Sequence, residues 1–319
     1  MYYEQIGGFI LGKDDDKVIK GDPDRIIQRP SDNYQYSHNF ERLILRCDRR
    51  YDRLMPEMLK AHIARTDQHI IVLYDFFVTL LGDSNLPLNP DRSEVNSKPS
   101  EVISNPDYWI YLVSLNPASL EIARAASKTH DLGCILSMID HPRLSLDIAF
   151  PLSVEVGYHP ERDRVFFKEL ADAIINHCGG NPTSMAARFM AEGDSSDRFI
   201  DSPELEKRLH YWMTPAALTC YNEADRLGEL AATDYNPPSE PVGFEEYCGA
   251  LAEKYGKDPP KLAEKIAGFL KDHYTNLGKT PIGMFIKAMT IGYAERVADR
   301  LLGNFGYSLS QVYERPKKK

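Results

Sequence analysis

One pair of residues, a helix-capping side chain followed directly by proline, recurs through the second half of this chain and constrains its fold more than any other feature. The capping oxygen can accept a backbone N–H of the first helical turn, and proline suits a position whose own N–H would have no partner. Each such pair therefore predicts the start of a helix. The pairs are Asn181-Pro182, Ser202-Pro203, Thr214-Pro215, Asp258-Pro259 and Thr280-Pro281.

Helical spacing of apolar residues extends this prediction to most of the chain. Apolar side chains recur at three- and four-residue steps in residues 40–54, which indicates an amphipathic helix. A second helix is predicted over residues 57–81, where Gly82 supplies a stop, and a third over residues 116–139. The last helix is predicted over residues 281–302, with one apolar face along its length.

Residues 145–168 instead predict β-structure. Apolar residues alternate with polar or small ones from Leu152 to Tyr158, which is typical of a half-buried strand, and the next residues, HPERDR, suit a turn. Short apolar runs broken by glycines predict further strands at the start of the chain. The predicted fold class is therefore α+β and predominantly helical, with a few short antiparallel strands at the N-terminus and at about residues 145–168 packed on helices, and with a C-terminal helical module.

A change in composition at residues 235–243, YNPPSEPVG, predicts a domain boundary. Three prolines stand there, and the net charge changes sign across it: residues 1–242 carry −13 and residues 243–319 carry +4, out of −9 in all. We therefore expect an acidic α+β body over residues 1–240 and a small basic three-helix module over residues 241–319, whose tail is frayed.

Composition also limits the environment of the protein. No run of eighteen or more apolar residues exists, so no membrane span is expected, and the first residues lack the basic start and apolar block of a signal peptide. The five cysteines are widely spaced with no C-x-x-C pair, which predicts reduced thiols and neither a disulfide framework nor a compact thiolate zinc site. We expect a cytoplasmic protein.

The segment Ser127–Leu136, SKTHDLGCIL, contains an adjacent histidine and aspartate, His130 and Asp131. HDLG resembles the middle of the pattern of HD-type phosphohydrolases, which hold one or two metal ions with an upstream His, a His-Asp pair and a downstream Asp, all on helices. The resemblance covers these four residues. The chain departs from the family at three points. A polar triplet precedes the pair, and Cys134 replaces a frequent lysine. The nearest upstream histidines, His69 and His62, lie across a long predicted loop rather than a few turns earlier.

Other polar residues offer ligands for such a site. Asp140 and His141 follow the pair closely, and His62 and His69 are seven residues apart, hence on one face of the same predicted helix. A divalent metal held by the pair and these residues would polarise a phosphate and activate water. The competing interpretation places each residue on a polar helix end or helix face, and the lack of any complete catalytic motif favours it.

The favoured function is therefore that of a non-enzymatic interaction protein without a cofactor, and a metal-dependent phosphohydrolase of HD type, using a divalent metal, is the alternative. In the favoured case the C-terminal helices bind a protein partner or nucleic acid through Lys287, Arg296 and Arg300, on the polar side of the last helix. Whether the protein is an enzyme stays open at this level.

Overall fold

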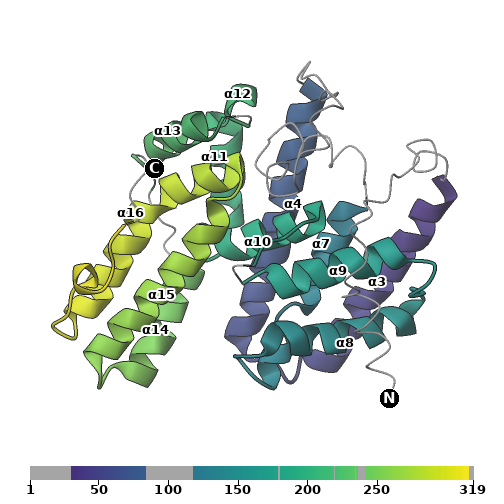
Figure 1. The fold of residues 1–319 in the computed structure, drawn as a ribbon, viewed down its shortest axis with the longest axis horizontal. Coiled ribbons are helices and arrows are strands. Elements are labelled where there is room, and N and C mark those ends of the chain that lie inside the picture. Colours follow the sequence, from purple (N-terminus) through teal and green to yellow (C-terminus); the bar gives the residue numbers. More distant parts are fainter. Residues whose placement is uncertain are drawn as a thin grey trace.

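The computed structural model describes residues 30–83, 118–178, 180–218, 220–233, 235 and 242–315, and every regular element in these ranges is helical (Figure 1). None of the described helices combines the length and the apolar composition that a bilayer span requires. The α-helices are α3 (Pro30–Tyr51), α4 (Glu57–Asp83), α7 (Ser119–Thr129), α8 (His141–Val156), α9 (Arg164–Asn176), α10 (Met185–Ser196), α11 (Ser202–Trp212), α12 (Pro215–Leu218), α13 (Tyr221–Ala232), α14 (Gly243–Tyr255), α15 (Pro259–Leu277) and α16 (Pro281–Gly303). Two short 3₁₀ helices, η2 (Leu132–Ile135) and η3 (Leu309–Gln311), complete the described elements.

Three of the predicted helix starts are confirmed with the expected cap. Thr280 accepts a hydrogen bond from the Gly283 N–H at 3.0 Å, and Asp258 accepts one from the Lys261 N–H at 3.3 Å. Thr214 caps the short helix α12 in the same way, at 3.3 Å. In α12, α15 and α16 proline is the first helical residue, where its missing N–H costs nothing.

The other two starts differ in detail. At α11 the cap is Asp201, one residue before the predicted Ser202, and its carboxylate accepts the Glu204 N–H at 2.8 Å. The start predicted at residues 181–182 is wrong, because α10 begins at Met185 and Ser184 provides the cap. In both cases another nearby side chain of a good capping type accepts the backbone N–H of the first helical turn.

The β-structure predicted for residues 145–168 is also wrong. The segment belongs to α8 and the start of α9, where Leu152 and Val156, four residues apart, are buried while Val154 is exposed. Pro151 lies on the exposed side, so water can bind the carbonyl that its missing N–H leaves unpaired. Gly157, in the left-handed region at φ 114°, ends the helix.

The α+β class is therefore corrected to an all-helical one for the described residues, which contain no strand. A short run of four alternating apolar residues is compatible with either a strand or a helix. Here the segment forms a helix, because its buried side chains pack against neighbouring helices. The strands predicted at the N-terminus fall outside the described residues.

Helix α10 lies at the centre of the described fold (Figure 1). All of its residues are buried, and it packs against α4, α7, α9 and α15. Gly193 permits the close crossing with α4, because a Cβ there would lie 2.8 Å from Ile70 Cγ1 and 3.3 Å from the Thr66 carbonyl oxygen. This crossing lays the end of α10 beside the first turns of α4, where the candidate site is found.

The helices predicted for the C-terminal module are present as α14, α15 and α16. They also contact the rest of the chain, since α16 packs along α13 and α15 packs against α10. Gly228 of α13 meets α16 so closely that a Cβ would lie 2.4 Å from the Phe285 carbonyl oxygen. The division of the chain into two domains at residue 240 stays a prediction.

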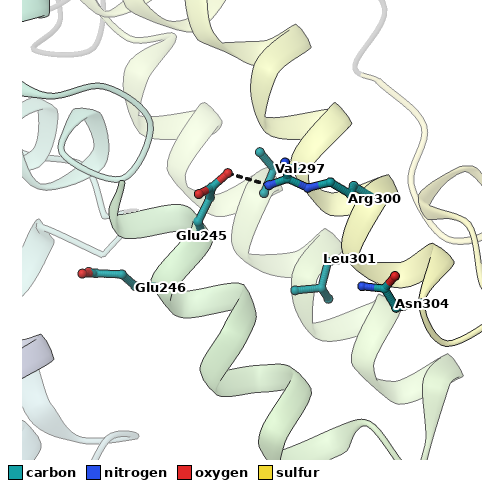
Figure 2. Close-up of a pocket in the computed structure, with 6 residues that line it drawn as sticks. All are labelled: Glu245, Glu246, Val297, Arg300, Leu301 and Asn304. Carbon is teal, nitrogen blue, oxygen red and sulfur yellow. Dashed lines mark hydrogen bonds and ion pairs between the residues drawn. The ribbon is translucent and has the colours of Figure 1, made fainter. Parts of the chain in front are cut away.

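A pocket of about 490 Å³ lies between α14 and α16 (Figure 2). Glu245 and Arg300 face each other across it with 2.7 Å between Oε1 and Nη2. Glu246 points away from that pair and instead accepts a hydrogen bond from Arg65 at 3.0 Å. The pocket is thus lined by paired charges and carries no cluster of candidate catalytic groups among the described residues.

Candidate metal centre

Four histidines and two aspartates, brought together by five helices, meet beside the end of α10. The helices carry them near their ends, so residues that are far apart in the sequence meet in one cluster. They are His62 in α4, His130 and Asp131 directly after α7, His141 at the start of α8, His177 directly after α9, and Asp194 in α10.

Each of the four imidazoles has its Nδ1 beside an oxygen acceptor. For His130, His141 and His177 the acceptor is the backbone carbonyl three residues earlier, at 2.8, 2.9 and 2.6 Å respectively. For His62 it is the Asp197 carboxylate, at 3.1 Å. Because these oxygens only accept, each Nδ1 carries a hydrogen, and Nε2 is the atom available to bind a cation.

The inward Nε2 atoms are arranged in two pairs. His62 and His130 Nε2 are 3.2 Å apart, and His141 and His177 Nε2 are 3.1 Å apart. Two lone pairs at these distances repel each other unless a positive charge lies between them. Each pair therefore calls for a proton or a metal ion.

The Asp131 carboxylate bridges the two pairs. Its Oδ2 lies 3.4 Å from His62 Nε2 and 3.5 Å from His130 Nε2, and its Oδ1 lies 3.3 Å from His141 Nε2 and 3.5 Å from His177 Nε2. One oxygen thus serves each pair of imidazoles. A carboxylate in this position can be shared by two cations.

We call the two parts of this cluster the inner half and the outer half. The inner half consists of His62, His130, Asp194 and Oδ2 of Asp131, and Asp194 Oδ1 lies 2.9 Å from His62 Nε2 and 3.6 Å from His130 Nε2. These residues are all buried.

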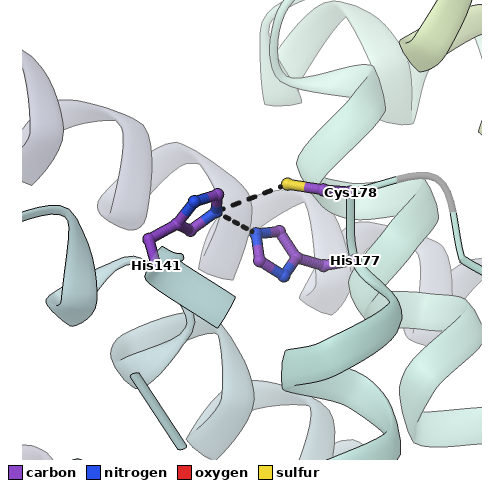
Figure 3. A group of neighbouring side chains, drawn as sticks. All are labelled: His141, His177 and Cys178. Carbon is purple, nitrogen blue, oxygen red and sulfur yellow. Dashed lines mark hydrogen bonds between the residues drawn. The ribbon is translucent and has the colours of Figure 1, made fainter. Parts of the chain in front are cut away.

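The outer half consists of His141, His177, Cys178 and Oδ1 of Asp131. Figure 3 shows His141 facing both His177 and Cys178, whose Sγ is 3.4 Å from His141 Nε2. His141 is partly exposed and Cys178 is exposed, whereas His177 is buried, so the outer half reaches the surface at His141 and Cys178.

Protonation follows this division. Burial and the Arg198 charge lower the pKa of His62, but the surrounding carboxylates outweigh them and raise it to about 10. Burial lowers the pKa of its neighbour His130. Burial also lowers the pKa of His177, but Cys178 and Asp131 raise it well above its ordinary value. Burial lowers the pKa of His141 as well, but Cys178 and Asp131 outweigh this and raise it. In the metal-free protein each imidazole pair therefore holds at least one proton at neutral pH.

The carboxylates carry the matching negative charge. Burial raises the pKa of Asp131, but the neighbouring histidines lower it well below its ordinary value, and the same holds for Asp194. At least two protonated imidazoles thus face two ionised carboxylates. In the metal-free protein these protons supply the positive charge that bound metal ions would supply in a metal-loaded centre.

Arg198 adds a permanent positive charge at the edge of the inner half. Its Nη2 lies 2.9 Å from His62 Nε2 and 4.0 Å from Asp194 Oδ1. Its Nε is buried without a hydrogen-bond acceptor, 3.5 Å from Asp197 Oδ1, and the guanidinium lies 5.7 Å from the centre of the Phe269 ring. Nη2 is within hydrogen-bond distance of His62 Nε2, so a cation bound at that nitrogen would displace this contact and free the Nη2 donor for an anion.

Gly133 holds the two halves of the cluster together. Its N–H donates to Ser145 Oγ at 2.8 Å, which docks η2 onto the first turn of α8. A Cβ at Gly133 would lie 2.4 Å from the His141 carbonyl oxygen and 2.7 Å from the Ser145 nitrogen. Only glycine therefore lets the chain carrying Asp131 approach the chain carrying His141.

We expect Gly133→Ala to lower the free energy of unfolding by about 1–3 kcal/mol, because the backbone of α8 cannot move aside cheaply. Urea denaturation measures this change. The matched control is Gly268→Ala in the middle of α15, where nothing lies within 4 Å of the new Cβ and the helix should gain about 0.5–1 kcal/mol. Equal effects at both positions would contradict the close approach.

The structure brings together four of the six residues considered as ligands from the sequence: His62, His130, Asp131 and His141. His69 and Asp140 lie elsewhere. Both ring nitrogens of His69 face backbone carbonyls, at 2.9 Å each, and burial lowers its pKa. Asp140 is exposed at the start of α8.

Three residues of the cluster have no counterpart in the sequence-based prediction: His177, Asp194 and Cys178. His177 and Cys178 stand before a Gly-Gly pair, which resembles a simple helix end. Asp194 carries little signal of its own, because the same helix also contains Arg188 and Glu192, and the sequence does not show which of these charges pair with each other.

The basic residues proposed to contact a partner lie on α16, away from this cluster. Arg300 pairs with Glu245, Arg296 is exposed, and Lys287 is half-buried, which lowers its pKa. Their role in binding a protein or nucleic acid stays a prediction.

The chain matches no protein-family model, and no curated protein or solved structure matches it. The function must therefore be inferred from the chemistry of the centre itself.

Proposed function

We propose that this protein is a metal-dependent phosphoester hydrolase whose centre takes two divalent cations. The single observation that carries the proposal is the Asp131 carboxylate between two pairs of imidazole Nε2 atoms, one oxygen to each pair. The inner half offers two nitrogens and two oxygens, and the outer half offers two nitrogens, one oxygen and a sulfur. Both sets suit a transition-metal ion such as Zn²⁺ or Mn²⁺.

The order of ligands along the chain supports the same class of enzyme. His62 precedes the His130-Asp131 pair, and Asp194 follows it, all on or beside helices. This is the arrangement of upstream His, His-Asp pair and downstream Asp in HD-type phosphohydrolases, which the HDLG segment resembles.

Divalent ions in this centre would polarise a phosphoryl oxygen and lower the pKa of a bound water. The chain's own residues have three tasks. The Nδ1 hydrogen bonds fix the four imidazole rings, and burial of the inner half excludes bulk water. Asp131 holds the two halves at a constant separation.

Arg198 supports a phosphate rather than a neutral substrate. Its guanidinium reaches the edge of the inner half, keeps its charge at all physiological pH values, and can donate two parallel hydrogen bonds to phosphate oxygens. The Phe269 ring on one side limits the directions in which it can move.

The test is hydrolysis of p-nitrophenyl phosphate and bis(p-nitrophenyl) phosphate by protein reconstituted with Mn²⁺ or Zn²⁺. We expect activity only with metal, about two ions per chain, and a KM about 10- to 100-fold higher for Arg198→Gln with unchanged metal content. Arg226→Gln, which alters an exposed pair with Glu223, is the matched control. A chain that binds no divalent ion and cleaves neither ester contradicts the proposal.

A further inference from the structure

The outer half differs from the inner half in one ligand, the sulfur of Cys178. The inner half presents only nitrogen and oxygen atoms to a cation. In the outer half, Cys178 Sγ, His141 and His177 form a group whose ligand atoms all lie within 4.8 Å of one another (Figure 3). The two halves therefore differ in the softness of their donors.

We propose that Cys178 is a thiolate ligand of the outer ion and makes the outer half selective for a thiophilic divalent cation of the Zn²⁺ type. The proposal rests on the two-ion centre described above. Together with His141, His177 and Oδ1 of Asp131 the sulfur completes four donors, the number that Zn²⁺ prefers.

The surroundings of the sulfur support this role. Cys178 Sγ lies 3.4 Å from His141 Nε2 and belongs to a group that contains both imidazoles of the outer half. Cys134 is a second cysteine that could bind the outer ion. It forms a group with Asp131 and His141 whose ligand atoms also lie within 4.8 Å of one another. That group lacks His177, so Cys134 lies with one imidazole of the outer half whereas Cys178 lies with both.

The position in the chain also suits a ligand. Cys178 directly follows His177 at the end of α9, and the Asn276 side chain of α15 donates to the His177 carbonyl at 2.9 Å. This bond fixes the peptide that joins the two residues. The Cys178 sulfur and the His177 imidazole are therefore held close to each other before an ion binds. Binding would cost these two side chains little conformational entropy.

Cobalt(II) titration of the full chain tests the proposal, because a Co–thiolate bond gives a charge-transfer absorption in the near ultraviolet that nitrogen and oxygen ligands do not. We expect the wild type to bind about two Co²⁺ ions with this band. Cys178→Ser should lose the band and keep the inner ion. Cys134→Ser, and Cys220→Ser at an exposed cysteine, should keep it.

Competition tests the selectivity. Stoichiometric Zn²⁺ should remove the band, and a large excess of Mg²⁺ should leave it unchanged. A wild type that binds Co²⁺ without the band, a band that persists in Cys178→Ser, or one that Mg²⁺ removes overturns the proposal. If the band behaves as expected but no phosphoester is cleaved, the proposed activity fails and the thiolate ligand stands. If no Co²⁺ binds, both fail.

Discussion

Asp131→Asn is expected to reduce metal-dependent phosphoester hydrolysis by on the order of 10³-fold or more. The substitution keeps the size of the side chain and removes the charge that both halves of the centre share. An amide presents one oxygen instead of two, so it can serve the inner or the outer half but not both. The measurement is kcat/KM at saturating metal, together with the number of ions bound per chain, which should fall below two.

The control for this variant is Asp147→Asn, which changes an exposed carboxylate on α8 that pairs only loosely with Arg143, at 3.7 Å. It should retain full activity and metal content. The metal-free Asp131→Asn protein should also unfold at a lower temperature, because His62 and His177 lose an ionised partner in a buried setting. An Asp131→Asn enzyme with wild-type kcat/KM would remove the basis of the two-ion centre.

Metal binding is expected to release at least two protons per chain at neutral pH and to strengthen as the pH rises. The metal-free protein holds at least one proton in each imidazole pair, since the pKa of His62 is raised to about 10 and that of His177 is raised well above its ordinary value. A cation must displace these protons. The apparent affinity should therefore increase about tenfold per pH unit for each proton released, up to about the pKa of His62.

Isothermal titration in buffers of different ionisation enthalpy measures the number of protons released. His62→Gln should lower this number by about one, and His210→Gln, at an exposed histidine of α11, should leave it unchanged. An affinity that is constant between pH 6 and pH 8 would show that the two pairs of imidazoles bind metal without holding protons first.

The helical elements could be predicted because their signals are local. A capping oxygen and the proline beside it, as at Thr280, act within one turn and need no information from elsewhere in the chain. The failure at residues 145–168 has a different origin. Four alternating apolar residues are compatible with a strand or a helix, and the burial of Leu152 and Val156 against neighbouring helices decided between them.

The candidate site could be predicted only in part because its ligands are far apart in the sequence. His130 and Asp131 are adjacent and attract notice, and His62 and His141 enter as nearby candidates. His177 and Asp194 lie far from the other ligands in the sequence. Only the packing of α9 and α10 against α7 brings them to the site. The prediction that favoured scattered polar residues did not take account of the close crossing of α4 and α10 at Gly193.

The ligands of the candidate centre differ in their exposure to solvent. His62, His130 and Asp194 are each at most 2% exposed, whereas Cys178 lies at the surface. If the centre holds two ions as proposed, the inner ion is enclosed by buried ligands and the outer ion has an exposed ligand. The two ions would then exchange with the solvent at different rates, the outer ion faster than the inner one.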